Sequence, residues 1–416
     1  MAIIKPFRAL RPTREVAQLV AAFPYDVMNT AEARELAEGN PYSFLHISRP
    51  EIDLPPDMDP YSEQVYLKGQ AKLEEFKRNG ILVPDETECF YVYRQRMGTI
   101  IQTGLVVCAG VDDYQRGVIK KHELTRADKE EDRVKHIDYL DANDEPVFYT
   151  YCSDSSNKAI AAQIEEIAGR EPVYDFTTDD GLAHTLWVVD DRVEIACLTD
   201  YFAAIPNLYV ADGHHRSAAA SRVREIRRNG NAGHNGNEEY NFFLTVIFPD
   251  KEMNVMPYNR VVKDLNGHNI AEFMVAMARK FEITPVRQPL NPVQRHQFGM
   301  FLAGKWYELL PREGSFDEND AVARLDVSIL QDNLLNPVLG VRNPRNDQRI
   351  HFVGGIRGLE ELERLVDNGE YQVAFSLFPT SIGELIKLAD AGKIMPPKST
   401  WFEPKLRSGL FLHPLK

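Results

Sequence analysis

The stretch Leu208-Tyr209-Val210-Ala211-Asp212-Gly213-His214-His215-Arg216 decides the fold around it. Its first four residues are apolar and predict a strand, and the alanine-rich segment that follows Arg216 predicts a helix. Gly213 allows the backbone to turn tightly between the two elements. A strand, a tight turn and a helix in this order are typical of an α/β protein, with the polar residues at the edge of a sheet.

This corner carries groups that suit an anion. The first amides of a helix have no partner within the helix and bind phosphate readily. Arg216 adds a bidentate cation, while His214 and His215 add donors or a titrating group. In the alternative interpretation Asp212 only caps the helix and the histidines fill polar surface. The clustering of these residue types favours a functional site.

A metal centre at the two histidines is less favoured. Adjacent residues point in different directions, and no His-x-x-x-His spacing follows. The four cysteines are isolated from one another, which argues against a structural zinc site and against a disulfide framework. We therefore expect no resident metal ion bound by the protein itself.

Length and charge limit the class of protein. The chain has 416 residues, with 48 Lys and Arg against 62 Asp and Glu, a net charge of −14. This length predicts two or three domains, and the acidic balance disfavours a protein that coats nucleic acid or anionic membrane. The longest apolar runs, residues 105–111 and 242–248, are far shorter than the ~20 residues of a membrane span. Residues 1–14 lack the apolar run of a secretory signal, so we expect a cytoplasmic protein.

Two α/β domains are predicted, residues 1–255 and residues 256–416. The first begins with helices at residues 30–38, where Thr30 can cap, and 61–79, and continues with paired strands at 89–94 and 100–109. Strands at residues 146–151, 187–189 and 241–248 follow. The second alternates helices and strands, which favours a sheet with helical cover; these elements are residues 270–280, 305–310, 328–339, 359–368, 373–377 and 381–391.

A second polar constellation lies in the proline-rich segment 395–405. Lys398, Ser399 and Thr400 present one cation and two hydroxyls, which suit phosphate oxygens. The alternative is a well-ordered loop in which Trp401 and Phe402 are packing anchors.

Three further segments contain candidate residues. The mixed-charge run 120–133 is by default a solvated helix, but His122, Glu123 and Arg126 are candidates for a site role. Asp26 follows aromatic residues in the turn 23–26, which lines a pocket or pins the loop to the core. Glu15 is a possible carboxylate base.

At these residues the chain resembles known families. Residues 23–27, 121–125, 212–216, 352–355 and 395–405 together resemble a widespread bacterial family of unknown function. Residues 212–216 and 369–400 also resemble the free-serine kinases, which have a ParB/sulfiredoxin-like fold and phosphorylate L-serine to O-phospho-L-serine. Residues 40–200 have no counterpart in these kinases, and after Thr400 the kinases continue with Arg-His where this chain has Trp401-Phe402.

The kinase resemblance implies a ParB/sulfiredoxin-like nucleotide-binding domain with a long insertion in residues 1–255, and a second α/β domain. It implies phosphoryl transfer with Mg²⁺ and with ATP or ADP as donor. The predicted catalytic residues are Asp212, His214 and Glu15; Glu15 follows Pro12 by three positions, as a loose match to a glutamate that the kinases carry after a proline, and Asp26 competes for its role. The predicted substrate-binding and phosphate-binding residues are Gly213, His215, Arg216, Lys398, Ser399, Thr400, Asp26, His122 and Glu123.

These observations predict a kinase for the hydroxyl group of a small metabolite, with free L-serine as the favoured acceptor. One alternative is a ParB-like nucleotide-binding regulatory module that turns over no metabolite. The other is a nucleic-acid-binding or nuclease protein, which the net charge of −14 disfavours.

Overall fold

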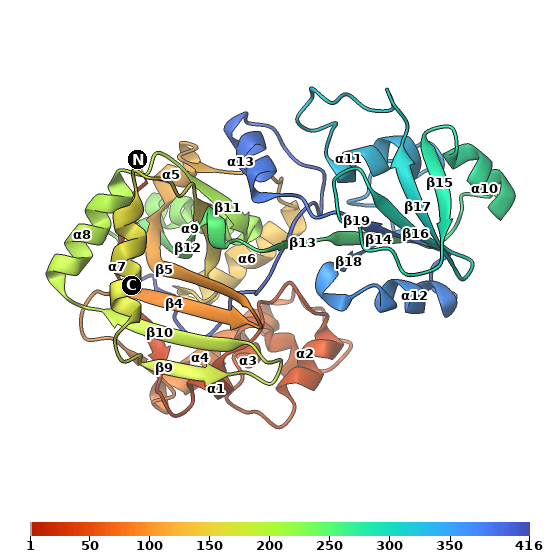
Figure 1. The fold of residues 1–416 in the computed structure, drawn as a ribbon. Helices are drawn as coiled ribbons and strands as arrows, with labels where there is room; N and C mark the ends of the chain where they lie inside the picture. The colour runs from red at the N-terminus through yellow and green to blue at the C-terminus, as the bar shows by residue number, and fades with distance from the viewer. Residues whose placement is uncertain (1) are drawn as a thin grey trace. The chain divides into compact units, whose positions relative to one another are not determined.

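The computed structural model describes residues 2–416, which form a mixed α/β protein of two compact units with several sheets (Figure 1). The first unit runs to Met253 and also includes Pro404–Lys416, and the second is Asn254–Glu403. The chain passes from the first unit to the second after Met253, two residues before the predicted boundary. The final segment, which the prediction placed in the second domain, belongs to the first unit.

A mixed nine-stranded sheet forms the centre of the first unit, within the described residues. Its order is β6-β11-β8-β12-β5-β4-β10-β9, with β1 beside β5. The predicted hairpin is confirmed: β4 and β5 pair antiparallel around Gly98, whose φ is 59°. The strands are β1 (Ile4–Lys5), β4 (Phe90–Met97), β5 (Ile100–Gly110), β6 (Ile119–Lys120), β8 (Val147–Tyr151), β9 (Tyr174–Thr177), β10 (Ala183–Val189), β11 (Leu208–Asp212) and β12 (Phe242–Pro249).

Helices cover this sheet and one another. Ile160 and Ile164 of α7 and Phe202 of α8 are buried in one core with strand residues such as Val107. Each such side chain contributes about 1.5–3 kcal/mol by leaving water. No helix within residues 2–416 is long and apolar enough to cross a bilayer. The helices of the unit are α1 (Ala17–Val20), α2 (Thr30–Ala37), α3 (Leu45–Ser48), α4 (Glu63–Arg78), α5 (Val111–Gln115), α6 (Ala127–Leu140), α7 (Lys158–Ala168), α8 (Arg192–Ala203) and α9 (His214–Gly230).

Two local expectations were wrong. Asn29, not Thr30, caps α2, because the Asn29 side chain accepts from two amides of the first turn and Glu32 closes the capping box. The run 120–133 is not one solvated helix. α6 begins only at Ala127, and Arg133 is buried, where its guanidinium binds Asp132 at 2.8 Å.

The second unit is built on a six-stranded antiparallel sheet in the order β15-β17-β16-β19-β14-β18. Leu362 and Leu365 of α12 pack on it. Ser381 caps α13 as predicted, and the helix predicted at 328–339 is a short α-helix followed by a π-helical turn. Its elements are β13 (Val255–Met256), β14 (Tyr258–Val262), α10 (Ile270–Met277), β15 (Phe281–Val286), β16 (Phe298–Leu302), β17 (Lys305–Pro311), α11 (Asp326–Leu330), β18 (Ile350–Gly354), α12 (Glu360–Asp367), β19 (Val373–Leu377), α13 (Ile382–Asp390) and β20 (Trp401–Phe402).

The C-terminal segment is fastened to the first unit by backbone and side-chain contacts. β21 (His413–Pro414) pairs with β7 (Ala142–Asn143). Glu239 contacts Lys5 Nζ at 2.6 Å and His413 Nε2 at 2.9 Å. Burial opposes ionisation of Glu239, but these two hydrogen bonds outweigh it and lower its pKa to about 2. The contacts hold the segment that also contains Lys405.

We expect the Glu239→Gln variant to unfold more easily at pH 7, by about 1–2 kcal/mol after allowance for partial exposure. The folded pKa of about 2 lies below the ordinary 4.5, so this stabilisation is complete above pH ~4.5 and is lost as the pH falls toward 2. Urea unfolding between pH 7 and pH 3 measures the gap from wild type, which should shrink on acidification. Glu166→Gln, at an exposed position on α7, is the control; an equal gap at both pH values would contradict this account.

Candidate anion-binding site

The predicted strand, turn and helix at residues 208–230 are confirmed. β11 ends at Asp212, Gly213 turns with φ 95°, and α9 starts at His214. The N-cap residue, Gly213, has no side chain that could cap this helix, and the first turn holds no acidic residue. The positive end of the α9 dipole favours a negatively charged group, and the Asp212 carboxylate lies directly before it.

Two cations approach the Asp212 carboxylate. Lys405 Nζ lies 2.7 Å from Oδ2, and a terminal nitrogen of Arg216 lies 4.0 Å from Oδ1. The Gly213 amide donates to Oδ1 at 2.8 Å. A carboxylate and an arginine of one segment thus meet a lysine from a distant segment at the start of α9.

The Arg216 side chain is held in place although it is only 7% exposed. It donates to the Pro146 carbonyl at 2.5 Å and lies 3.7 Å from the Asp26 carboxylate. Its Nε is buried without a hydrogen-bond partner in the described residues. Burial opposes its charge, but Asp26, Glu145 and Asp212 raise its pKa above the ordinary value. Arg216 therefore stays cationic.

Glu145 organises the buried layer behind the corner. Its Oε1 accepts from the Tyr25 amide at 2.9 Å and from the Ser408 hydroxyl at 3.0 Å. Burial and the neighbouring Asp144 raise the pKa of Glu145. The guanidinium of Arg133 stacks 4.0 Å from the Tyr25 ring centre. These contacts pin the 23–26 turn, as one interpretation of the sequence expected, and place Asp26 near Arg216.

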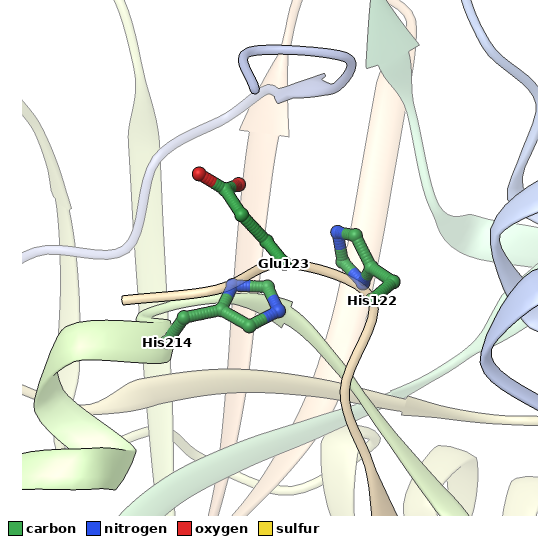
Figure 2. Close-up of side chains that lie close together, drawn as sticks. All are labelled: His122, Glu123 and His214. Carbon is green, nitrogen blue, oxygen red and sulfur yellow. The ribbon is translucent and has the colours of Figure 1, made fainter. Parts of the chain in front are cut away.

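The segment after β6 places His122 and Glu123 beside His214 (Figure 2). The two imidazoles meet edge to face with ring centres 4.5 Å apart, and they are 1% and 6% exposed. Burial, offset in part by Asp212, lowers the pKa of His122 to about 4 and also lowers that of His214. Both rings are therefore neutral at pH 7.

His215 has a different environment from His214. Its Nε2 accepts a hydrogen bond from the Arg126 amide at 3.0 Å, which requires an unprotonated Nε2. The Arg126 guanidinium is exposed and pairs with Asp128. His215 thus fastens the 121–126 segment to α9.

The remaining predicted site residues belong to other segments of the chain. Glu15 is exposed before α1, where hydrogen bonds from its own amide and from Thr13 lower its pKa. Lys398, Ser399 and Thr400 belong to the second unit. There Lys398 has a φ of 58° and lies 5.6 Å from the Tyr258 ring centre, and the buried Ser399 hydroxyl donates to the Pro396 carbonyl at 2.6 Å. The phosphate role of these three residues stays a prediction.

Sequence reasoning assigned no role to Lys405, Glu145 or Arg133. Lys405 is the last residue of the 395–405 segment, where it follows a run of polar and proline residues. That position is the sequence signal that could have indicated its role. Glu145 and Arg133 are charged residues in mixed local sequence, where nothing indicates burial. Their contacts join segments far apart in the chain.

Two cavities in the first unit help to locate ligand binding. One, of about 10 Å³, lies behind the corner against Arg133, Glu145 and Arg216 and holds one water at most. A larger one, of about 360 Å³, is lined by residues such as Asp154, Asp200 and Tyr209, with no Lys, Arg or His among its lining residues. Its lining offers no cation to a phosphate group.

The fold and this corner define an α/β protein with a strand–turn–helix element that is a candidate for anion binding. Residues 4–328 match the family described as "Protein of unknown function (DUF1015)", and the chain belongs to that family. The predicted resemblance to a family of unknown function is thereby confirmed. The comparison with curated proteins gave no significant match.

Solved structures show distant likeness. A conserved hypothetical protein from Pyrococcus furiosus is 14% identical, with a TM-score of 0.35 over 74% of this chain and 95% of that chain. A free serine kinase in complex with AMP is 12% identical, with a TM-score of 0.36 over 74% and 91%. C-terminally truncated SbnI from Staphylococcus aureus is 10% identical, with a TM-score of 0.40 over 74% and 87%. These likenesses are too distant to show what this chain binds.

We expect Gly213→Ala to destabilise the corner by about 1–3 kcal/mol, since a non-glycine residue is strained at this φ. The added Cβ would lie 3.1 Å from Val147 Cγ1 and 3.2 Å from Arg216 Nε. Chemical unfolding measures the loss. Gly230→Ala is the matched control at the other end of α9, where nothing lies within 4 Å of the added carbon. Equal effects of the two substitutions would show that the Gly213 conformation is not special.

Proposed function

We propose that the protein transfers a phosphoryl group from ATP or ADP to the hydroxyl of a small metabolite, with free L-serine as acceptor. The observation that carries this proposal is the Asp212 carboxylate, which lies between Lys405 and Arg216 at the start of α9, where Gly213 is the N-cap residue. In this proposal the first unit is a nucleotide-binding domain of ParB/sulfiredoxin-like type, in line with the sequence resemblance of residues 212–216 to the free-serine kinases.

The corner supplies the groups that this reaction needs. The substrate hydroxyl gives its proton to a carboxylate, and its oxygen forms a bond to the terminal phosphorus of the nucleotide. The bond from that phosphorus to the bridging oxygen breaks, which leaves ADP from ATP, or AMP from ADP. Arg216, Lys405 and the first amides of α9 neutralise the negative charge on the transferred group and on the leaving phosphate.

Two carboxylates compete for the role of base. Asp212 is at the corner itself, and its oxygens accept from Lys405 and Gly213. Glu15 retains the role that the sequence resemblance implies. His214, neutral and buried beside Asp212, is placed to orient the substrate rather than to neutralise phosphate.

Mg²⁺ is expected as part of the nucleotide complex. Mg²⁺ prefers an octahedral set of oxygen ligands and keeps several waters. The only three-residue group at metal-ligand spacing among residues 2–416 contains two imidazoles. The corner therefore does not fit a resident Mg²⁺, and the nucleotide phosphates would carry the ion in.

Asp212→Asn should lower phosphoserine formation by about 10²–10⁴-fold if Asp212 is the base. The test incubates purified protein with L-serine, Mg²⁺ and either ATP or ADP, and measures O-phospho-L-serine. Glu15→Gln is measured in parallel, and whichever variant loses turnover identifies the base. Arg228→Gln, an exposed change on α9 outside the corner, is the control for the helix.

The outcomes separate the candidate functions. No turnover on a panel of hydroxyl metabolites, with nucleotide binding intact, would overturn the kinase proposal and favour a regulatory nucleotide-binding module. Salt-sensitive retention of DNA would favour the nucleic-acid alternative. Full activity of both Asp212→Asn and Glu15→Gln would overturn the assignment of the base.

Lys405→Met should weaken nucleotide binding by about 10–100-fold, because it removes a charged hydrogen-bond donor from the site. Calorimetric titration with ADP measures the change in Kd. Lys416→Met is the matched control on the same C-terminal segment, since Lys416 is exposed and pairs with Asp141. An unchanged Kd for Lys405→Met would remove Lys405 from the phosphate site.

A further inference from the structure

His122, Glu123 and His214 form a compact group of nitrogen and oxygen ligand atoms. One ligand atom from each residue lies within 4.8 Å of the others (Figure 2). The group joins the segment after β6 to the first residue of α9. From the sequence alone, only His214 and its neighbour His215 are candidates for metal ligands. The fold instead pairs His214 with His122 from a distant segment.

The imidazoles of this group are available as ligands. More than nine-tenths of each side chain is buried. Neither ring nitrogen of His122, nor Nε2 of His214, makes a hydrogen bond of normal geometry within the described residues. The Val210 backbone lies close enough to His122 for a weak hydrogen bond only. Burying such nitrogens without partners costs free energy unless they bind something. Neutral imidazole is the form that binds metals.

We propose that His122, Glu123 and His214 bind one divalent transition-metal ion. Two imidazoles and one carboxylate suit Zn²⁺, Mn²⁺, Fe²⁺ or Co²⁺, while Mg²⁺ and Ca²⁺ prefer oxygen ligands alone. Three protein ligands leave at least one coordination position open, as in catalytic rather than structural zinc sites.

The geometry requires side-chain movement. Atoms bound to one tetrahedral ion at about 2.1 Å each lie ~3.4 Å apart. The atoms of the group, at up to 4.8 Å, must therefore approach by up to about 1.4 Å, which rotation of the Glu123 and histidine side chains can supply.

The position of the group would let such an ion bind a substrate oxygen, in addition to the side chains that the proposed function uses. His214 follows Gly213 directly, so the ion would lie beside the anion-binding corner. Its open position could take an oxygen of the bound anion or of the acceptor hydroxyl. The metal site itself does not depend on the proposed function, because binding is measured without any substrate.

The test uses the full chain after treatment with a chelator. Titration with Co²⁺ is followed by its visible absorption, and the metal content after Zn²⁺ loading is measured by mass spectrometry. We expect one ion per chain in wild type, not displaced by excess Mg²⁺, and an affinity at least about 100-fold lower in His122→Gln and His214→Gln. His234→Gln is the matched control, because His234 forms an imidazole–carboxylate pair with Glu238 in the same unit but outside the group.

Circular dichroism shows which variants stay folded. Should a histidine variant unfold, Glu123→Gln at a half-buried position gives the same test, with the same expected loss of affinity. Absence of Co²⁺ binding by folded wild type, or full binding by the folded His122→Gln, His214→Gln or Glu123→Gln protein, would overturn the proposal. Metal binding without phosphoserine formation would support the metal site. It would contradict only the proposed kinase activity.

Discussion

The 2.7 Å contact between the Asp212 carboxylate and the Lys405 ammonium joins residues 193 positions apart, and the arrangement of the corner depends on it. Lys405 reaches Asp212 because Pro404–Lys416 belongs to the first unit and is held there by β21 and by Glu239. Both groups are largely buried, so loss of one partner would leave the other charge poorly solvated, at a cost between the ~1 kcal/mol of surface pairs and the 3–5 kcal/mol of buried ones.

Positively charged groups gather around this contact, although the chain as a whole is acidic. The protein carries a net charge of −14, yet Arg216, Lys405 and the first amides of α9 converge on one point. Glu145 and Asp26 keep Arg216 charged although it is buried. In the proposed function these cations bind a small phosphorylated ligand rather than a polyanion, because a long polyanion would also meet the negative charge of the rest of the protein.

Much of the local structure could be predicted, since short-range rules were sufficient for it. The β4–β5 hairpin follows from two apolar runs around Gly98, and the Ser381 cap follows from its spacing to Glu384. Strands β14, β15 and β16 were not predicted, because each owes its pairing to the other strands of the sheet. The burial of Arg133 was also missed, since its partners Tyr25 and Glu145 come from other segments.

The sequence by itself determined the strand, the Gly213 turn and the α9 helix, together with the family resemblance of residues 212–216. These depend on apolar periodicity and on the conformational freedom of glycine, which act between near neighbours in the chain. Only the tertiary structure decided that Lys405 contacts Asp212 and that His122 with Glu123 lies against His214. Such contacts form when packing of the sheet and its helices brings distant segments together. The spacing of residues along the chain does not predict which distant segments will meet.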